Sequence, residues 1–166
     1  MITIYIVSTI YHYTKFYLEG QSLYNYTMQR VLKISIDQIP ETARKIASRL
    51  RGGEILALVG PLGSGKTTFT QALGKALGIR KKITSPTFIL MQQYPARVTN
   101  KDGRKRRVTL YHLDLYRTEN FREVAALGIS EHWGAPETVT VIEWAEKIQS
   151  KIPKNSIFIH ITNPYA

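Results

Sequence analysis

The sequence predicts an α/β fold, in which a partly parallel sheet with one antiparallel hairpin is flanked by helices. Two unbroken apolar runs, at 55–59 and 139–142, are typical of strands that are covered on both faces, as in a parallel sheet. Apolar residues at helical spacing precede and follow the first run, over 39–50 and 69–77. This alternation of strand and helix indicates α/β layers.

The composition is that of an ordinary globular protein with one domain. The chain has 166 residues, of which 43% are hydrophobic and 21% charged, and this balance excludes wholesale disorder. Cysteine is absent, which excludes a disulfide scaffold, a thiol nucleophile and a Cys-ligated zinc site. No apolar run approaches the roughly 18 residues of a membrane-spanning helix, and the first residues lack the features of a secretory signal. We therefore expect a cytoplasmic protein without a membrane partner.

Residues 1–27 differ from the rest of the sequence. They contain six of the ten tyrosines, no proline, and neither helical nor sustained alternating apolar spacing. Met28 then opens a conventional sequence. We expect 1–27 to be an N-terminal extension outside the working domain, which would comprise residues 28–166.

The first half of this domain predicts strand, helix, strand and helix. Residues 31–36 indicate a strand, and Asp37 is the expected N-cap of the helix that follows. That helix ends at Gly52 and Gly53, before the strand 55–59. A glycine-rich turn leads into the second amphipathic helix, which ends at Gly78.

The second half predicts a hairpin, a short helix and two further strands. Residues 88–94 and 108–116 are the expected hairpin strands, joined by a long basic tip with a turn signal at Asp102-Gly103. Thr118 or Asn120 caps the expected short helix, which Gly128 closes. The strands 139–142 and 156–161 complete the sheet.

Residues 60–67 read GPLGSGKT and match the phosphate-binding motif G-x-x-x-x-G-K-[ST] at every fixed position. Glycines let the backbone N–H groups face a β-phosphate, and the helix N-terminus adds a positive dipole. Lys66 would reach the β- and γ-phosphates, and Thr67 would offer its hydroxyl to Mg²⁺. A glycine-rich turn with a surface lysine is the alternative, but the flanking strand and helix favour a P-loop NTPase-like sheet that binds a nucleoside triphosphate.

A P-loop enzyme also needs an acid beside Mg²⁺, usually at the end of a neighbouring strand. Glu143 directly follows the run 139–142, and Asp114 ends another predicted strand on the face that carries His112. One acid would hold the Mg²⁺ shell while the other orients or deprotonates water. The sequence leaves open which acid does which, although Thr67 and Glu143 are the expected metal ligands.

Four aromatic and basic side chains lie near these motifs, and the role of two of them is open. Trp144 either flanks the nucleotide or packs in the core, and Trp133 is expected in the core. Arg117 is either a phosphate-binding group or a surface residue. His112 is expected to hydrogen-bond within the sheet. The spacing at Asn100-Lys101-Asp102 misses the guanine-reading motif by one residue, which favours ATP over GTP.

Charge is concentrated in one short segment. Lys and Arg outnumber Asp and Glu by 23 to 12, giving a net charge of +11. The segment 97–107, from Arg97 to Arg107, holds six basic residues against Asp102 alone. Such an excess favours a polyanionic partner such as RNA or an acidic protein surface.

Four motifs occur in the order and spacing of one protein family, at 60–68, 85–88, 112–117 and 142–144. Through them the sequence resembles the TsaE (YjeE) family from about Met28 to Ile161. These are bacterial P-loop ATPases required for threonylcarbamoyladenosine formation in tRNA. The resemblance implies an ATPase that is weak alone and works with a TsaB-like and a TsaD-like protein, so that hydrolysis resets the complex that modifies ANN-decoding tRNA.

The resemblance also implies roles for particular residues. Asp114 and Glu143 would be the catalytic and metal-side acids, residues 85–88 would resemble a switch loop near the γ-phosphate, and Trp144 would lie beside the nucleotide. The expected ATP-binding residues are Gly60, Leu62, Gly63, Ser64, Gly65, Lys66, Thr67, Thr68 and Trp144. We expect tRNA contact through the complex and the basic segment 97–107.

Two other functions compete with this one. A small-molecule P-loop kinase could use residues 97–107 as a lid that closes over its phosphates. A non-catalytic RNA-binding module would explain the charge but would leave Asp114 and Glu143 without a role. Release of phosphate from ATP with no acceptor present, stimulated by a partner pair, would separate the ATPase from both.

Overall fold

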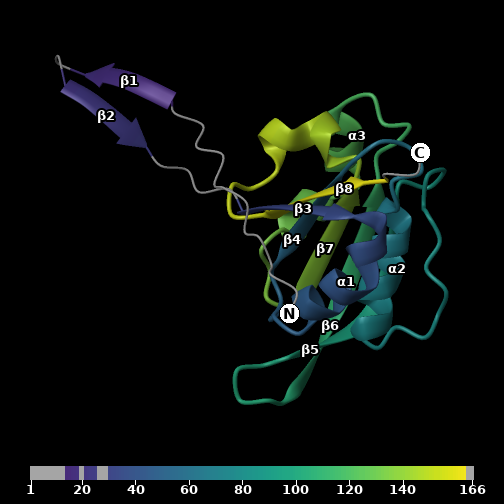
Figure 1. Cartoon of the computed structure of the whole chain (residues 1–166). Helices are drawn as coiled ribbons and strands as arrows, with labels where there is room; N and C mark the ends of the chain where they lie inside the picture. Colours follow the sequence, from purple (N-terminus) through teal and green to yellow (C-terminus); the bar gives the residue numbers. More distant parts are fainter. Residues whose placement is uncertain (1–13, 19–20, 26–29, 164–166) are drawn as a thin grey trace.

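The computed structural model of the chain describes residues 14–18, 21–25 and 30–163 (Figure 1). Strands β1 (Thr14–Leu18) and β2 (Gln21–Asn25) pair antiparallel in a sheet of their own. This hairpin was not expected from the sequence, because the segment lacks sustained alternation of apolar and polar residues. Met28, the expected start of the domain, lies outside the described residues, as do the parts of 1–27 beyond β1 and β2.

A six-stranded sheet forms the centre of the domain, in the order β3-β8-β4-β7-β6-β5. All neighbours are parallel except the hairpin β5–β6, as the sequence predicts. The strands are β3 (Arg30–Ser35), β4 (Ile55–Val59), β5 (Met91–Thr99), β6 (Lys105–Asp114), β7 (Thr138–Glu143) and β8 (Ile157–Thr162). The α/β fold is therefore confirmed, with an antiparallel strand at one edge.

Helices cover both faces of this sheet (Figure 1). On one face α1 (Ile39–Ala47) and α2 (Lys66–Ala76) pack through a core that includes the fully buried Phe69 and Leu73. The other face carries α3 (Phe121–Ala126) and the 3₁₀ helices η2 (Ile129–His132) and η3 (Ala145–Lys151), packed around Leu115 and Phe158. Asn120 caps α3 by accepting a hydrogen bond from the Arg122 N–H at 2.9 Å. No helix among the described ranges is long and apolar enough to cross a membrane.

Three local expectations were wrong. The expected long basic tip between 94 and 108 is short, because β5 continues to Thr99 and β6 begins at Lys105, so that most of the basic residues lie in the paired strands. Asp37 does not cap α1, because it lies inside the 3₁₀ turn η1 (Ile36–Gln38) that precedes the helix. Strand β5 begins at Met91 instead of residue 88, because Leu90 has a positive φ of 60° that breaks the extended backbone. Phe88 and Ile89 consequently lie in an exposed loop.

Strand direction determines where the functional residues gather. Strands β4, β7 and β6 are parallel neighbours, so their carboxyl ends lie at the same edge of the sheet. The P-loop segment follows β4, while Glu143 ends β7 and Asp114 ends β6. Asp114 and Glu143 are register partners across β6 and β7. The topology therefore brings both acids to the segment 60–67.

Candidate functional site

The segment 60–67 forms a tight turn between β4 and α2 that only glycine accommodates at two positions. Gly65 is the N-cap of α2 with φ +101°, and a Cβ there would lie 2.7 Å from the Ile39 side chain. Gly60 has φ +154°, and a Cβ there would meet the Ile161 carbonyl oxygen. The turn aims the first N–H groups of α2, which have no partner within the helix, at the space above it. An anion is the natural ligand for such a helix end.

Lys66 turns its side chain back over this loop. Its Nζ donates hydrogen bonds to the carbonyl oxygens of Gly60 at 2.7 Å and Pro61 at 2.8 Å. The same atom lies 3.7 Å from the centre of a Trp144 ring, in a cation–π contact. Burial lowers the pKa of the Lys66 amine, and the negative charge of Glu143 opposes that shift. The Lys66 amine is thus a buried cation whose hydrogen-bond acceptors are uncharged carbonyl oxygens.

Three polar side chains converge on the carboxylate of Glu143. Thr67 Oγ1 donates to Oε2 at 2.9 Å, and Thr70 Oγ1 donates to Oε1 at 3.3 Å. His112 Nε2 lies 2.7 Å from Oε1. Glu143 and His112 are buried, so this carboxylate is fixed in position by its partners. Oε2 of Glu143 faces the hydroxyl of Thr67, and these two groups are the metal ligands that the sequence predicts.

Asp114 has a separate set of partners from the segment 85–87. Thr87 Oγ1 donates to its Oδ2 at 2.7 Å, and Ser85 Oγ donates to the same oxygen. The Tyr116 backbone N–H donates to Oδ1 at 2.9 Å. The loop that follows α2 is therefore tied to the end of β6, beside the P-loop.

These elements enclose a cavity of about 470 Å³, a size typical of small-molecule sites. Nine of the expected site residues line it, namely Leu62, Gly63, Gly65, Lys66, Thr67, Thr68, Asp114, Glu143 and Trp144. Gly60 and Ser64 do not line it but lie behind Lys66, where Ser64 is fully buried. Most of the residues that the sequence predicts for the site therefore line a single cavity.

The residues present fit a magnesium–nucleotide complex. A threonine hydroxyl and a carboxylate, Thr67 and Glu143, lie within hydrogen-bond distance of each other, and both are oxygen ligands of the kind that Mg²⁺ prefers. A buried amine and a glycine-rich helix end beside them suit phosphate oxygens.

Sequence reasoning missed several residues of this site. Thr70 is one helical turn after Lys66, a spacing that could have indicated it. Ile36 also lines the cavity, although it lies in no motif, and Tyr116 lines it from within the motif 112–117. Arg117 lines it too, with its guanidinium 4.4 Å from the Phe88 ring centre, so it is more than a remote surface residue. Trp133 packs against the second core, as expected.

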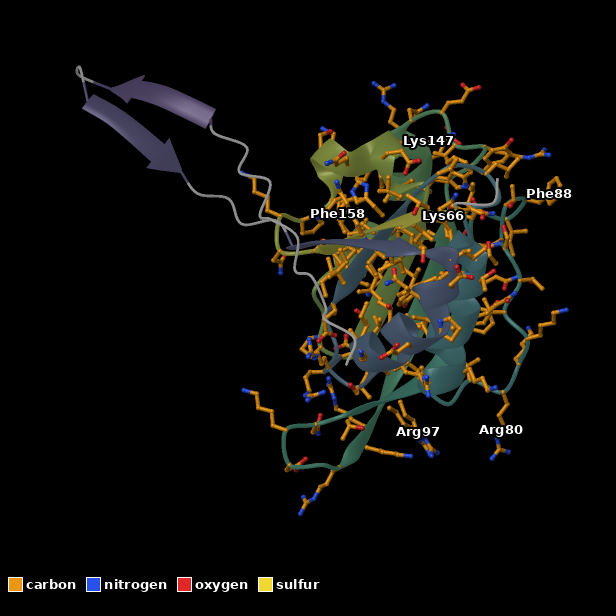
Figure 2. The ribbon with its side chains drawn as sticks, in the orientation of Figure 1. Lys66, Arg80, Phe88, Arg97, Lys147 and Phe158 are labelled. Carbon is orange, nitrogen blue, oxygen red and sulfur yellow. The ribbon has the colours of Figure 1, made fainter. Side chains whose placement is uncertain are left out.

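The basic hairpin lies at the opposite end of the sheet. Strand β6 runs from Lys105 to Asp114, and at about 3.3 Å per residue its ends are about 30 Å apart. Figure 2 shows Arg97 far below Lys66, with Phe88 near the upper end. A kinase lid formed by residues 97–107 would be at the wrong end to close over the P-loop.

Comparisons with known proteins agree with this geometry. The profile of the family "Threonylcarbamoyl adenosine biosynthesis protein TsaE" matches residues 34–165. A tRNA threonylcarbamoyladenosine biosynthesis protein TsaE from Nostoc is 39% identical, over 70% of this chain and 67% of its own. Its Bacillus subtilis counterpart is 34% identical, over 77% of this chain and 73% of its own. The crystal structure of Bacillus subtilis YdiB superposes with a TM-score of 0.54 and 29% identity, covering 78% of this chain and 72% of that one.

Proposed function

Because the chain belongs to the TsaE family, whose members are tRNA threonylcarbamoyladenosine biosynthesis proteins, we propose that it is a cytoplasmic Mg²⁺-dependent ATPase serving that modification. The observation that carries the proposal is the convergence of Lys66, Thr67, Asp114 and Glu143 on one cavity. In a P-loop enzyme these are the groups that bind the phosphates, hold the metal and direct water.

Each residue has a role that follows from its contacts. Lys66 would exchange the carbonyl oxygens of Gly60 and Pro61 for the β- and γ-phosphate oxygens of ATP, which are stronger acceptors. Thr67 and Glu143 would hold Mg²⁺, which when bound neutralises charge on the phosphates. Trp144, already against the Lys66 amine, would flank the nucleotide.

Asp114 is the acid that we assign to water. Its partners come from the segment 85–87 and from Tyr116, so it is not tied to Thr67 as Glu143 is. From the edge of the cavity its carboxylate would orient a water molecule toward the γ-phosphorus and accept its proton, while the bond to the bridging oxygen of ADP breaks.

The rim of the cavity suits a protein partner. Leu62, Phe88 and Tyr116 line the cavity, and they are 72%, 81% and 43% exposed, with Ile89 beside them at 59%. Exposed apolar side chains gathered around a site mark a contact surface. We propose that a TsaB-like and TsaD-like pair docks here and stimulates a hydrolysis rate that is weak in the isolated protein.

Three variants test the proposal. Lys66→Ala should lose both ATP binding and hydrolysis, because it removes the cation that pairs with the phosphates. Glu143→Gln and Asp114→Asn keep the shape of the side chain but lose its charge, so they should bind ATP and lose turnover. ATP binding is measured by calorimetry, and phosphate release is measured without an acceptor, with and without the partner pair.

The matched control is Lys154→Ala, which removes an exposed lysine far from the motif and should match the parent in both assays. Parental hydrolysis by either acid variant would show that its assignment is wrong. Binding of ATP without any turnover, even with the partner pair, would favour the non-catalytic RNA-binding module.

A further inference from the structure

A second cavity lies where the β5–β6 hairpin meets the ends of α1 and α2. This groove has a volume of about 1180 Å³ and is lined by the end of α1, by residues 75–80 after α2, and by the two hairpin strands. We call it the basic groove. The Arg97 N–H donates to the Leu77 carbonyl oxygen at 3.0 Å, which ties the hairpin to the end of α2 and fixes the walls relative to each other.

The charge of the basic groove is entirely of one sign. Its described lining residues include no Asp or Glu, and six are basic: Arg44, Lys75, Arg80, Arg97, Lys105 and Arg107. All six are exposed. Within the part of the chain that the structure describes, none of them makes an ion pair. They are therefore cations available to a ligand.

Helix ends explain only part of this charge. Arg44 and Lys75 lie in the last turns of α1 and α2, where a cation is stabilised by the helix dipole. Arg80, Lys105 and the pair Arg97 and Arg107 have no such compensation. Arg97 and Arg107 are direct cross-strand partners, an arrangement in which like charges are destabilising. The fold thus places two arginines directly opposite each other, an unfavourable pairing of charge that a bound polyanion would offset.

The basic groove is separate from the nucleotide site. Helix α2 begins at Lys66 beside the P-loop and ends at Ala76 beside the groove, about 15 Å further along its axis. Figure 2 shows Arg80 and Arg97 together at the end of the molecule opposite Lys66. The phosphates of a bound ATP therefore cannot be the ligand of this groove.

We propose that the basic groove binds the phosphate backbone of a structured RNA, an inference that rests on the proposed role in tRNA modification. Several cations spread over two strands and a loop suit the repeated phosphates of a folded RNA, and guanidinium forks bind phosphate oxygens in pairs. The binding surface includes Arg80 and Lys75 in addition to the hairpin, so it is broader than the segment 97–107 that the sequence indicates.

The test is a triple variant, R80Q/R97Q/R107Q, in the full chain. Binding to an unmodified transcript of an ANN-decoding tRNA is measured by fluorescence anisotropy over a series of salt concentrations, with no nucleotide present. Each lost phosphate contact removes roughly 0.7 to 0.9 from the slope of log affinity against log salt. We expect the slope to become shallower by about 2 to 3.

The control variant R122Q/K151Q/K154Q removes the same charge from exposed positions outside the basic groove. It should keep the parental affinity and slope, and both variants should keep the parental affinity for ATP. Equal weakening by the two triple variants would overturn the proposal in favour of net charge alone. RNA binding by the groove variant at the parental affinity would also overturn the proposal. If that variant then failed to bind the TsaB-like and TsaD-like pair, the ligand of the groove would be an acidic protein.

RNA binding is measured without nucleotide, so its result does not depend on whether the protein hydrolyses ATP. Failure of the Lys66, Asp114 and Glu143 variants to behave as expected would contradict the ATPase and leave the RNA result standing. Failure of the groove variant would leave the ATPase standing.

Discussion

Glu143 is the side chain on which the site depends most, since it accepts from Thr67 and Thr70 and lies 2.7 Å from His112 Nε2. His112 is fully buried and approaches from the neighbouring strand, away from the cavity, so it acts through Glu143 as a positioning residue. Partners of this kind fix the orientation of a metal-binding carboxylate. Under the proposed function, loss of this hydrogen bond would therefore weaken the binding of Mg²⁺ more than the binding of ATP.

His112→Leu should lower kcat by about 10- to 100-fold with little change in the KM for ATP, and should raise the Mg²⁺ concentration needed for half-maximal rate. His112→Gln can still donate to Glu143 and should recover part of that loss. Both are followed by steady-state kinetics over a Mg²⁺ series, with circular dichroism to confirm the fold. A loss of kcat that is the same for Leu and Gln would show that the imidazole serves packing only.

The motif and the strand-end rule predicted where Lys66, Thr67, Asp114 and Glu143 lie, because both are local in sequence. The contacts of Thr70 and His112 with Glu143 were not predicted. The contact with His112 depends on the register between β6 and β7, which places His112 opposite Val141, and no local pattern encodes that register. Thr70 meets Glu143 only because α2 packs across the end of β7.

At the scale of the element, β5 shows why strand limits are hard to predict. Phe88 and Ile89 are apolar and were included in the strand, yet both are exposed. The true strand continues to Thr99 with Tyr94, Ala96 and Val98 buried in alternation, a signal that was present in the sequence. Pro95 and the neighbouring basic residues obscured it, because proline is excluded from strands other than those at an edge. As the edge strand of the sheet, β5 tolerates this proline.

Strand β8 carries a pH-sensitive contact. Burial is the main cause that lowers the pKa of His160, and the charge of Lys33 adds to it; Lys33 is the register partner of His160 on β3. The unfolded chain therefore binds a proton more readily than the folded protein as the pH falls through 6.5. Protonation accordingly favours unfolding, so this histidine reduces stability on the acid side of neutrality.

His160→Gln should lessen the loss of unfolding free energy between pH 7 and pH 5, because glutamine cannot take up the proton. The measurement is urea denaturation of parent and variant at both pH values. Lys33→Gln is the companion variant, and it should lessen the same loss by a smaller amount, since burial remains. Identical pH dependence in parent and His160→Gln would contradict the assignment.

At the scale of the whole molecule, the described residues form two separate sheets, the pair β1–β2 and the six-stranded sheet of the α/β fold. Among the residues that the structure describes, β1 and β2 pair only with each other, and the family profile begins at residue 34. The boundary at Met28 remains a prediction, based on the abrupt change in composition at that point.

A shortened chain that begins at Met28 should fold, hydrolyse ATP at the parental rate and melt within a few degrees of the full chain. Thermal melting and phosphate release are the two measurements, made with the partner pair present and absent. Loss of several degrees on truncation would show that residues 1–27 stabilise the domain. Loss of stimulation alone would show that they serve the partner contact.

The β5–β6 hairpin also leaves few free N–H groups at the edge of the six-stranded sheet that β5 forms. Because the Arg97 N–H donates to Leu77 instead of β6, every second residue of β5 from Met91 to Thr99 has its N–H on the outer side. The Met91 N–H donates to the Ile89 carbonyl oxygen and the Arg97 N–H donates to the Leu77 carbonyl oxygen, while Pro95 has no N–H group. In this row the N–H groups of Gln93 and Thr99 remain for an added strand, so a peptide that lengthens the sheet, or a second molecule that stacks edge to edge, meets an interrupted series of donors. A ligand that binds beside β5 is therefore recognised mainly by side chains.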